Sequence, residues 1–279
     1  MRTSRIFQLS LKTSALLAAS VLFFIVFFLI CESAPLLSKV GFSAFFELNW
    51  HPLDGEYSLS AMLVGSLVVA FGAVIVATPL GIMVALFGQF YAPEKLAKAY
   101  LTMIELLAGV PSVVYGFWGL TILVPWITLW APPGASVLAG IIVLAMMILP
   151  LVVLTSDAAL SSVPRKYLTS AQALGLSRWG IIYRLALPIA TPGIISGVIL
   201  QSGRALGETM AVLMVTGNVV QIPSSWFQPV RTLTANIALE MAYAVGDHRQ
   251  ALFMSGTVLL LLTIIIVALA HYALKERRA

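Results

Sequence analysis

The sequence contains six long, predominantly apolar segments, and no other feature restricts its possible folds as strongly. A helix needs about 20 mostly apolar residues to cross the hydrocarbon core of a bilayer, because its backbone polar groups can be satisfied there only within the helix. Segments of this kind lie at approximately 11–31, 59–90, 100–127, 136–154, 189–215 and 251–274. The sequence therefore predicts an all-α integral membrane protein with about six transmembrane helices.

The composition supports a lipid environment. Sixty per cent of the residues are hydrophobic and 10% are charged, whereas soluble domains carry roughly 25% charged residues. The excess of Lys and Arg does not indicate nucleic-acid binding, because these residues stand in short clusters between the apolar segments. Pro79 and Pro111 interrupt the second and third segments, and we expect a kink or a tilt there. The single cysteine, Cys31, excludes an internal disulfide bond.

The loops between the segments fall into two sets that differ in basic charge. With six spans, both termini share one side with the loops at 91–99 and 155–188. That set carries twelve Lys and Arg residues: Arg2, Arg5, Lys12, Lys95, Lys98, Arg165, Lys166, Arg178, Arg184, Lys275, Arg277 and Arg278. The opposite set carries only Lys39, Arg231 and Arg249. By the positive-inside rule, we expect both termini in the cytoplasm.

On this plan the chain has three parts. Residues 1–58 form a retained anchor helix and an outer loop, residues 59–274 form the main transmembrane domain, and residues 275–279 form a cytoplasmic tail. We expect the Trp and Tyr residues of the outer segments 32–58 and 217–250 to lie at the level of the lipid headgroups rather than to contact a ligand.

The cytoplasmic loop at 155–188 predicts a short helical hairpin. Ala171 belongs to a stretch of helix-forming residues, Gly175 permits a reversal after a helix C-terminus, and Ser177 can cap the next helix. In that second helix Trp179, Ile182 and Tyr183 are expected on one face, while Arg178 and Arg184 lie elsewhere. Such an apolar knob would be covered either by a protein partner or by lipid headgroups, and periodicity does not distinguish these.

Three charged residues stand within the apolar segments and away from their ends: Glu105, Arg204 and Glu208. A charge in the bilayer costs roughly 2.5–3.5 kcal/mol on insertion scales, so its presence indicates a function. Arg204 and Glu208 are four residues apart, which predicts that they share a helix face and can pair. Either the pair serves only structure, or Arg204 offers its donors to an oxyanion in a transport pathway or its gate.

The hairpin segment resembles the cytoplasmic signature of bacterial ABC-importer permeases, which reads Glu-Ala-Ala, three residues, Gly, nine residues, Ile-x-Leu-Pro. Gly175, Leu187 and Pro188 stand at the matching spacings, whereas Thr169 replaces the usual Glu and Leu185 the usual Ile. The resemblance implies the type I importer permease fold and a coupling helix that docks on an ATPase subunit. The residues assigned to coupling are Ala171, Gly175, Arg178, Trp179, Leu187 and Pro188.

Two further stretches resemble the phosphate-specific ABC importer permeases, particularly the PstC-like first member of their two paired subunits. These are GRALGETMAV at 203–212 and ELLAGVPSVVYGFWGL at 105–120, and the similarity covers most of residues 60–271. The resemblance implies inorganic phosphate as the substrate and places Arg204, Glu208 and Glu105 in the pathway or gate. It also implies a PstA-like second permease, a PstB-like ATPase dimer that carries ATP and Mg, and a PstS-like extracytoplasmic phosphate-binding protein.

Other functional classes lack their required residues. No G-x-x-x-x-G-K-[ST] phosphate-binding motif is present, so ATP hydrolysis is expected on another chain and no cofactor on this one. His51 and His248 lie outside the apolar segments and His271 stands close to the end of the last one, which argues against a membrane metalloprotease. Two alternatives stay open: a permease for another oxyanion such as arsenate, and an ion-coupled carrier that uses Glu105 and Glu208 as proton relays.

Overall fold

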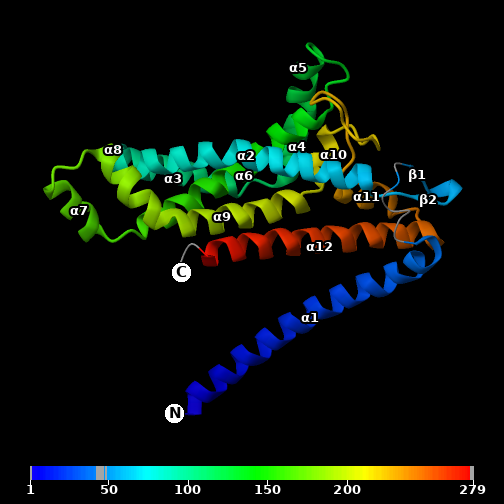
Figure 1. Cartoon of the computed structure of the whole chain (residues 1–279), viewed down its shortest axis with the longest axis horizontal. Coiled ribbons are helices and arrows are strands. Elements are labelled where there is room, and N and C mark those ends of the chain that lie inside the picture. The colour runs from blue at the N-terminus through cyan, green and yellow to red at the C-terminus, as the bar shows by residue number, and fades with distance from the viewer. Residues whose placement is uncertain (1, 42–46, 48, 277–279) are drawn as a thin grey trace.

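The computed structural model describes residues 2–41, 47 and 49–276, and this part of the chain is almost entirely helical (Figure 1). The long helices are α1 (Arg2–Val40), α2 (Ser60–Phe90), α3 (Glu94–Ala108), α6 (Val137–Ser161), α9 (Leu187–Gly207) and α12 (Gly246–Glu276). The shorter ones are α4 (Ser112–Trp118), α5 (Val124–Thr128), α7 (Arg165–Ala173), α8 (Arg178–Ile181), α10 (Met210–Val215) and α11 (Leu233–Glu240). Two π-helical turns at Gly119–Leu123 and Ile182–Ala186 join α4 to α5 and α8 to α9.

Among the described residues, five helices are long and apolar enough to cross a membrane, and a bent pair counted as one span makes six, in agreement with the predicted number. In the bent pair, α3 and the α4–α5 segment meet at 89°. The expected kink at Pro111 is therefore present and is close to a right angle. Proline lacks an amide donor and disfavours helical geometry in the residue before it, which explains the break at 109–111. Pro79, in contrast, lies inside the uninterrupted helix α2.

The core of the bundle is formed by α2, α6 and α9, which pack along one another (Figure 1). Their contact surfaces include small residues that allow close approach. A Cβ atom on Gly81 of α2, for example, would lie only 2.6 Å from Cγ1 of Val152 on α6. Ala73, Ala77, Leu144 and Ile148 are fully buried at the same contact. Glycine and alanine thus allow α2 and α6 to approach closely.

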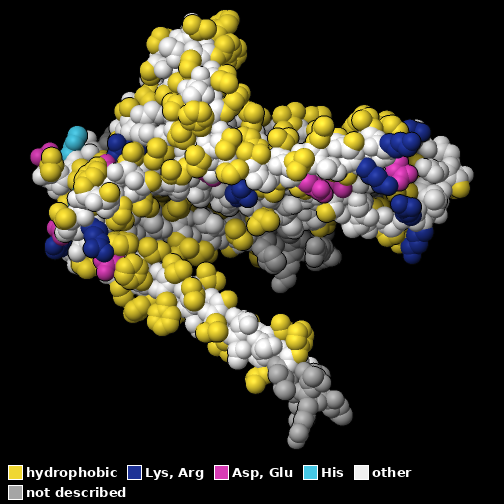
Figure 2. Space-filling view, turned by 180° about the vertical axis from the view of Figure 1, so that it is seen from behind, with side chains coloured by type: hydrophobic (Ala, Val, Ile, Leu, Met, Phe, Trp, Pro, Cys, Tyr) yellow, Lys and Arg dark blue, Asp and Glu magenta, His cyan; other side chains and the backbone are white. Residues whose placement is uncertain are grey.

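Two segments leave the bundle. The arm formed by α4 and α5 projects to the side, with α10 beside α4 (Figure 1). The C-terminal part of α1, where Ser33 and Leu36 are buried, packs against α12. The N-terminal half of α1 diverges from the bundle in Figure 1. Apolar side chains cover the middle of the molecule, and many Lys and Arg side chains gather at the end formed by α7 and α8 (Figure 2).

The opposite end carries a small two-stranded sheet. Strands β1 (Trp50–His51) and β2 (Glu56–Tyr57) are antiparallel and are joined by a 3-10 turn at Pro52–Asp54. The inner side chains Trp50 and Tyr57 are buried in a cluster that contains Leu36, Leu233 and Leu252. Both aromatic side chains are therefore buried in a protein core.

The fifth span differs from the prediction. We expected one helix over 189–215, but the continuous helical span runs over Arg178–Gly207, and Met210–Val215 is a separate helix. At the break, Glu208 has extended backbone angles (φ −68°, ψ 130°). This break decides the geometry of the charged residues.

Candidate functional site

Two apolar segments are interrupted along their length, and the elements at the interruptions pack together. The first break lies at 109–111 between α3 and α4, and the second lies at Glu208 between α9 and α10. A Cβ atom on Gly116 of α4 would lie 2.7 Å from the Cα atom of Ala211 on α10. Within a bilayer, irregular backbone is tolerated only where protein buries it or where it lines an aqueous cavity. The paired breaks are therefore the candidate site in the membrane.

Arg204 and Glu208 do not pair, which makes the predicted intrahelical ion pair wrong. Because the chain leaves the helix at Glu208, the two residues no longer share a helix face. Instead, Oε1 of Glu208 accepts a hydrogen bond from the backbone N–H of Ala211 (3.1 Å) and so caps the start of α10. The backbone carbonyl of Glu208 accepts a bond from Thr234 Oγ1 (2.8 Å).

Arg204 and Glu208 each carry the charge that the dipole of the neighbouring helix, α9 or α10, favours at that end. Arg204 lies in the last turn of α9, where the helix dipole favours a cation, and Glu208 lies just before α10, where it favours an anion. In this chain the side chain of Arg204 is exposed, and no ion pair to it is present among the described residues. Its guanidinium is thus available to a ligand.

Glu105 lies near the other break. It occupies the last turn of α3 and is exposed, and within the described part of the chain it forms no ion pair. A hydrogen bond stabilises the bend beside Glu105. The Tyr115 hydroxyl donates to the Leu107 carbonyl (2.9 Å) across the break. That bond satisfies one carbonyl at the end of α3.

The predicted hairpin is present at the end opposite the sheet (Figure 1). Helix α7 ends at a reversal in which Gly175 has φ +78°, and the Leu176 N–H bonds to the Ala171 carbonyl (3.1 Å). Ser177 caps α8 by accepting a bond from the Gly180 N–H (3.2 Å). The assignments of Gly175 as the reversal and Ser177 as the cap are both confirmed.

The apolar knob on the hairpin differs in one member from the prediction. Trp179 and Tyr183 are 63% and 66% exposed, but Ile182 is only 1% exposed. Ile182 lies in the π-helical turn through which α8 continues into α9, and there its side chain is buried. Leu174, next to the reversal, is exposed and completes the knob. The knob therefore consists of Leu174, Trp179 and Tyr183.

The other assigned coupling residues occupy different environments. Ala171 is buried, Arg178 is exposed, and Leu187 and Pro188 form the first turn of α9. Pro188 has no amide hydrogen to donate to the preceding turn, which accounts for the π-helical turn directly before it. Ala171, Leu187 and Pro188 thus shape the hairpin, whereas Arg178 and Trp179 are presented on its surface.

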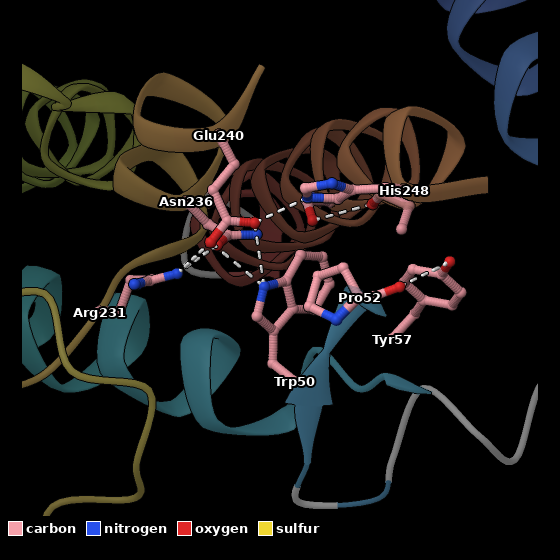
Figure 3. A network of polar contacts seen from close by, with 9 residues as sticks. Trp50, Pro52, Tyr57, Arg231, Asn236, Glu240 and His248 are labelled. Atoms are coloured by element: carbon pink, nitrogen blue, oxygen red, sulfur yellow. Dashed lines mark hydrogen bonds and ion pairs between the residues drawn. The ribbon is translucent and has the colours of Figure 1, made fainter. Parts of the chain in front are cut away.

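The structure also contains a buried ionic network that the sequence did not reveal (Figure 3). Glu240, at the end of α11, accepts bonds from Arg231 Nη1 (2.5 Å) and Trp50 Nε1 (3.1 Å), and His248 Nε2 lies 2.8 Å from Oε2. Arg231 also donates from Nη1 to Asn236 Oδ1 (3.0 Å). The network ties the sheet, α11 and α12 into one unit at the end opposite the hairpin.

Comparisons with known proteins agree with this architecture. The chain is 34% identical to the "Phosphate transport system permease protein PstC" of Mesorhizobium japonicum, with 98% of this chain and 90% of the relative covered. It is 39% identical to the "Probable ABC transporter permease protein YqgH" of Bacillus subtilis, over 83% of this chain and 77% of the relative.

The fold is also that of solved transporter subunits. A chain of a bacterial alginate ABC transporter, solved with an alginate pentasaccharide-bound periplasmic protein, superposes with a TM-score of 0.63 at 18% identity, over 94% of each chain. Residues 77–279 match the family model described as "Binding-protein-dependent transport system inner membrane component". This chain is therefore a multi-pass inner-membrane protein and belongs to the family of binding-protein-dependent transport system inner membrane components.

Proposed function

We propose that this chain is one of two permease subunits in an ATP-driven importer of inorganic phosphate. The observation that carries the proposal is Arg204 at the break between α9 and α10, which is exposed and has no ion pair among the described residues, in a chain similar over nearly its full length to a phosphate transport permease. A guanidinium with several fixed donors suits a tetrahedral oxyanion. A second permease subunit would cover the exposed face of α9 and complete the pathway.

The energy source lies on other chains under this proposal. A cytoplasmic ATPase dimer binds ATP and Mg, docks on the exposed knob of Leu174, Trp179 and Tyr183, and transmits its movement through α8 to α9. An extracytoplasmic phosphate-binding protein delivers the substrate at the end that carries β1 and β2. The basic residues near α7 and α8 support a cytoplasmic location for the hairpin end of the molecule. Cysteine labelling tests this orientation after Cys31 has been replaced by Ser. A membrane-impermeant maleimide should label Asp54→Cys in intact cells, whereas it should label Leu174→Cys only after permeabilisation.

Purification of the tagged chain tests the assignment. We expect a second permease and an ATPase subunit to co-purify, and ATP hydrolysis by the reconstituted complex to rise when phosphate-loaded binding protein is added. An ion-coupled carrier that relays protons through Glu105 and Glu208 would transport phosphate without an ATPase. Phosphate transport by the chain alone, driven by a pH gradient, would therefore exclude the proposed importer.

Gly175→Val is expected to uncouple the transporter. The left-handed backbone at Gly175 (φ +78°) is strained for a β-branched residue, while a Cβ atom there meets nothing within 4 Å, so the effect acts through the backbone. Stimulated ATP hydrolysis should fall several-fold. Gly175→Asn is the matched control, since Asn tolerates left-handed geometry, and it should retain most activity. Unchanged uptake and ATPase assembly in Gly175→Val would rule out docking through the hairpin.

A further inference from the structure

A cavity of about 730 Å³ opens at the end that carries the sheet, and the site in the membrane does not use it. The turn between β1 and β2 forms one wall, and the residues from the end of α11 to the start of α12 form the other. Its lining includes Leu53, Tyr57, Glu240, Tyr243, Asp247 and His248. Two of these are acidic, and no Lys or Arg is among the described residues that line it.

The walls of this outer pocket are fixed in advance. Glu240 joins Trp50 of β1 to His248 of α12 through the buried network (Figure 3), so both walls are held by bonds to one carboxylate. Arg231 compensates the charge of Glu240 from outside the cavity. Binding of a ligand would therefore cost little conformational entropy, because the surface is already ordered.

Of the two acidic residues in the lining, Asp247 is the one whose carboxylate can accept a further hydrogen bond. Its Oδ1 is 2.6 Å from Nζ of Lys39, and its side chain is 41% exposed. No described residue bonds to Oδ2, whereas both oxygens of Glu240 are occupied. The field of Asp247 reaches into the cavity: burial first, and this negative charge second, raise the pKa of Tyr57 above its ordinary value, and the smaller opposing effect of the Lys39 ammonium does not cancel the shift. The cavity is thus electrostatically suited to a cation, with Tyr57 and Tyr243 as aromatic neighbours.

The rim is apolar and protrudes from the molecule. Leu53, at the tip of the turn between the strands, is fully exposed, and Tyr243 and Val245 are 64% and 78% exposed. Figure 1 places the sheet at the extreme end of the long axis, beyond the start of α2. Apolar groups around a partly exposed charge are the arrangement found at protein–protein hot spots, where the rim excludes water from the central contact.

We propose that the outer pocket receives a cationic side chain, Lys or Arg, from the extracytoplasmic binding protein, with Asp247 as its acceptor. This inference rests on the proposed function, which supplies that partner. The family is described as binding-protein-dependent. The elements that line the pocket, the sheet and the start of α12, lie at the end opposite the hairpin (Figure 1). The acidic lining makes the pocket complementary to a basic residue and fixes the orientation in which the partner docks.

The test measures ATP hydrolysis by the reconstituted full transporter against the concentration of phosphate-loaded binding protein. Asp247→Asn should raise the half-saturating concentration by about five-fold at low salt. Added salt should weaken docking to the unchanged transporter more than docking to this variant, because salt screens the ion pair. Asp54→Asn removes a carboxylate from the turn between β1 and β2 that lies outside the cavity lining, and it should leave the half-saturating concentration unchanged.

Lys39→Gln separates docking from a structural role of Asp247. If Asp247 acted only through its bond to Lys39, Lys39→Gln would weaken docking as much as Asp247→Asn does. If Asp247 accepts the partner's cation, Lys39→Gln removes a competitor and docking should be equal or tighter. An unchanged half-saturating concentration in Asp247→Asn overturns the inference and leaves the pocket to a lipid headgroup. Absence of any stimulation in the unchanged transporter would instead overturn the proposed function.

Discussion

Arg204→Gln should assemble normally and yet transport phosphate at least about ten-fold more slowly. The expected loss follows from the energy of a charge-assisted hydrogen bond to an oxyanion, about 1.5–3 kcal/mol. The fold should survive because Arg204 is exposed and forms no ion pair in the described structure. The measurement is phosphate uptake by reconstituted transporter, with ATPase binding assayed in the same preparation. Arg204→Lys, which keeps the charge but loses the fork of donors, should be intermediate.

Glu208, the other charged residue near this break, provides the control. Glu208→Gln retains an oxygen that can accept the Ala211 N–H, so α10 should stay capped. The double variant Arg204→Gln, Glu208→Gln should remain as defective as Arg204→Gln alone. Recovery of uptake in the double variant would show that the two charges serve only to neutralise each other. Near-normal uptake in correctly assembled Arg204→Gln would end the pathway or gate assignment.

Glu240→Ala should destabilise the end that carries the sheet by about 3–5 kcal/mol, the cost of removing one partner from a buried ion pair. The side chains of Glu240 and Arg231 are only 9% and 18% exposed, so solvent screens this pair little. The substitution also removes the acceptor of Trp50 Nε1 and the partner of His248. We expect a lower thermal midpoint for the purified chain and faster hydrogen exchange at β1 and β2.

Two variants make the measurement specific. Glu240→Gln keeps an acceptor for Arg231 and Trp50, and it should lose less stability than Glu240→Ala. Asp54→Ala removes an exposed carboxylate on the turn of the same sheet and should leave the midpoint unchanged. Equal midpoints for Glu240→Ala and the unchanged chain would show that the network does not hold the two walls together.

The sequence determined the features that depend on local composition and spacing. Long apolar runs indicated the spans, because a lipid environment imposes their length. Gly175 and Ser177 marked the hairpin, because a left-handed reversal and a cap each depend on a single residue type. Pro111 marked a break, although the sequence did not give its angle of 89°.

Only the tertiary structure decided the features that depend on residues far apart in the chain. The break at Glu208 is supported by its bond from Thr234, 26 residues away, so helical spacing wrongly paired Glu208 with Arg204. Ile182 was placed on the knob by periodicity, but the course of α8 into α9 turned it inward. Trp50 and Glu240 are separated by 190 residues, and no local pattern relates them. Folding brings them together because a buried carboxylate must find donors wherever the chain supplies them.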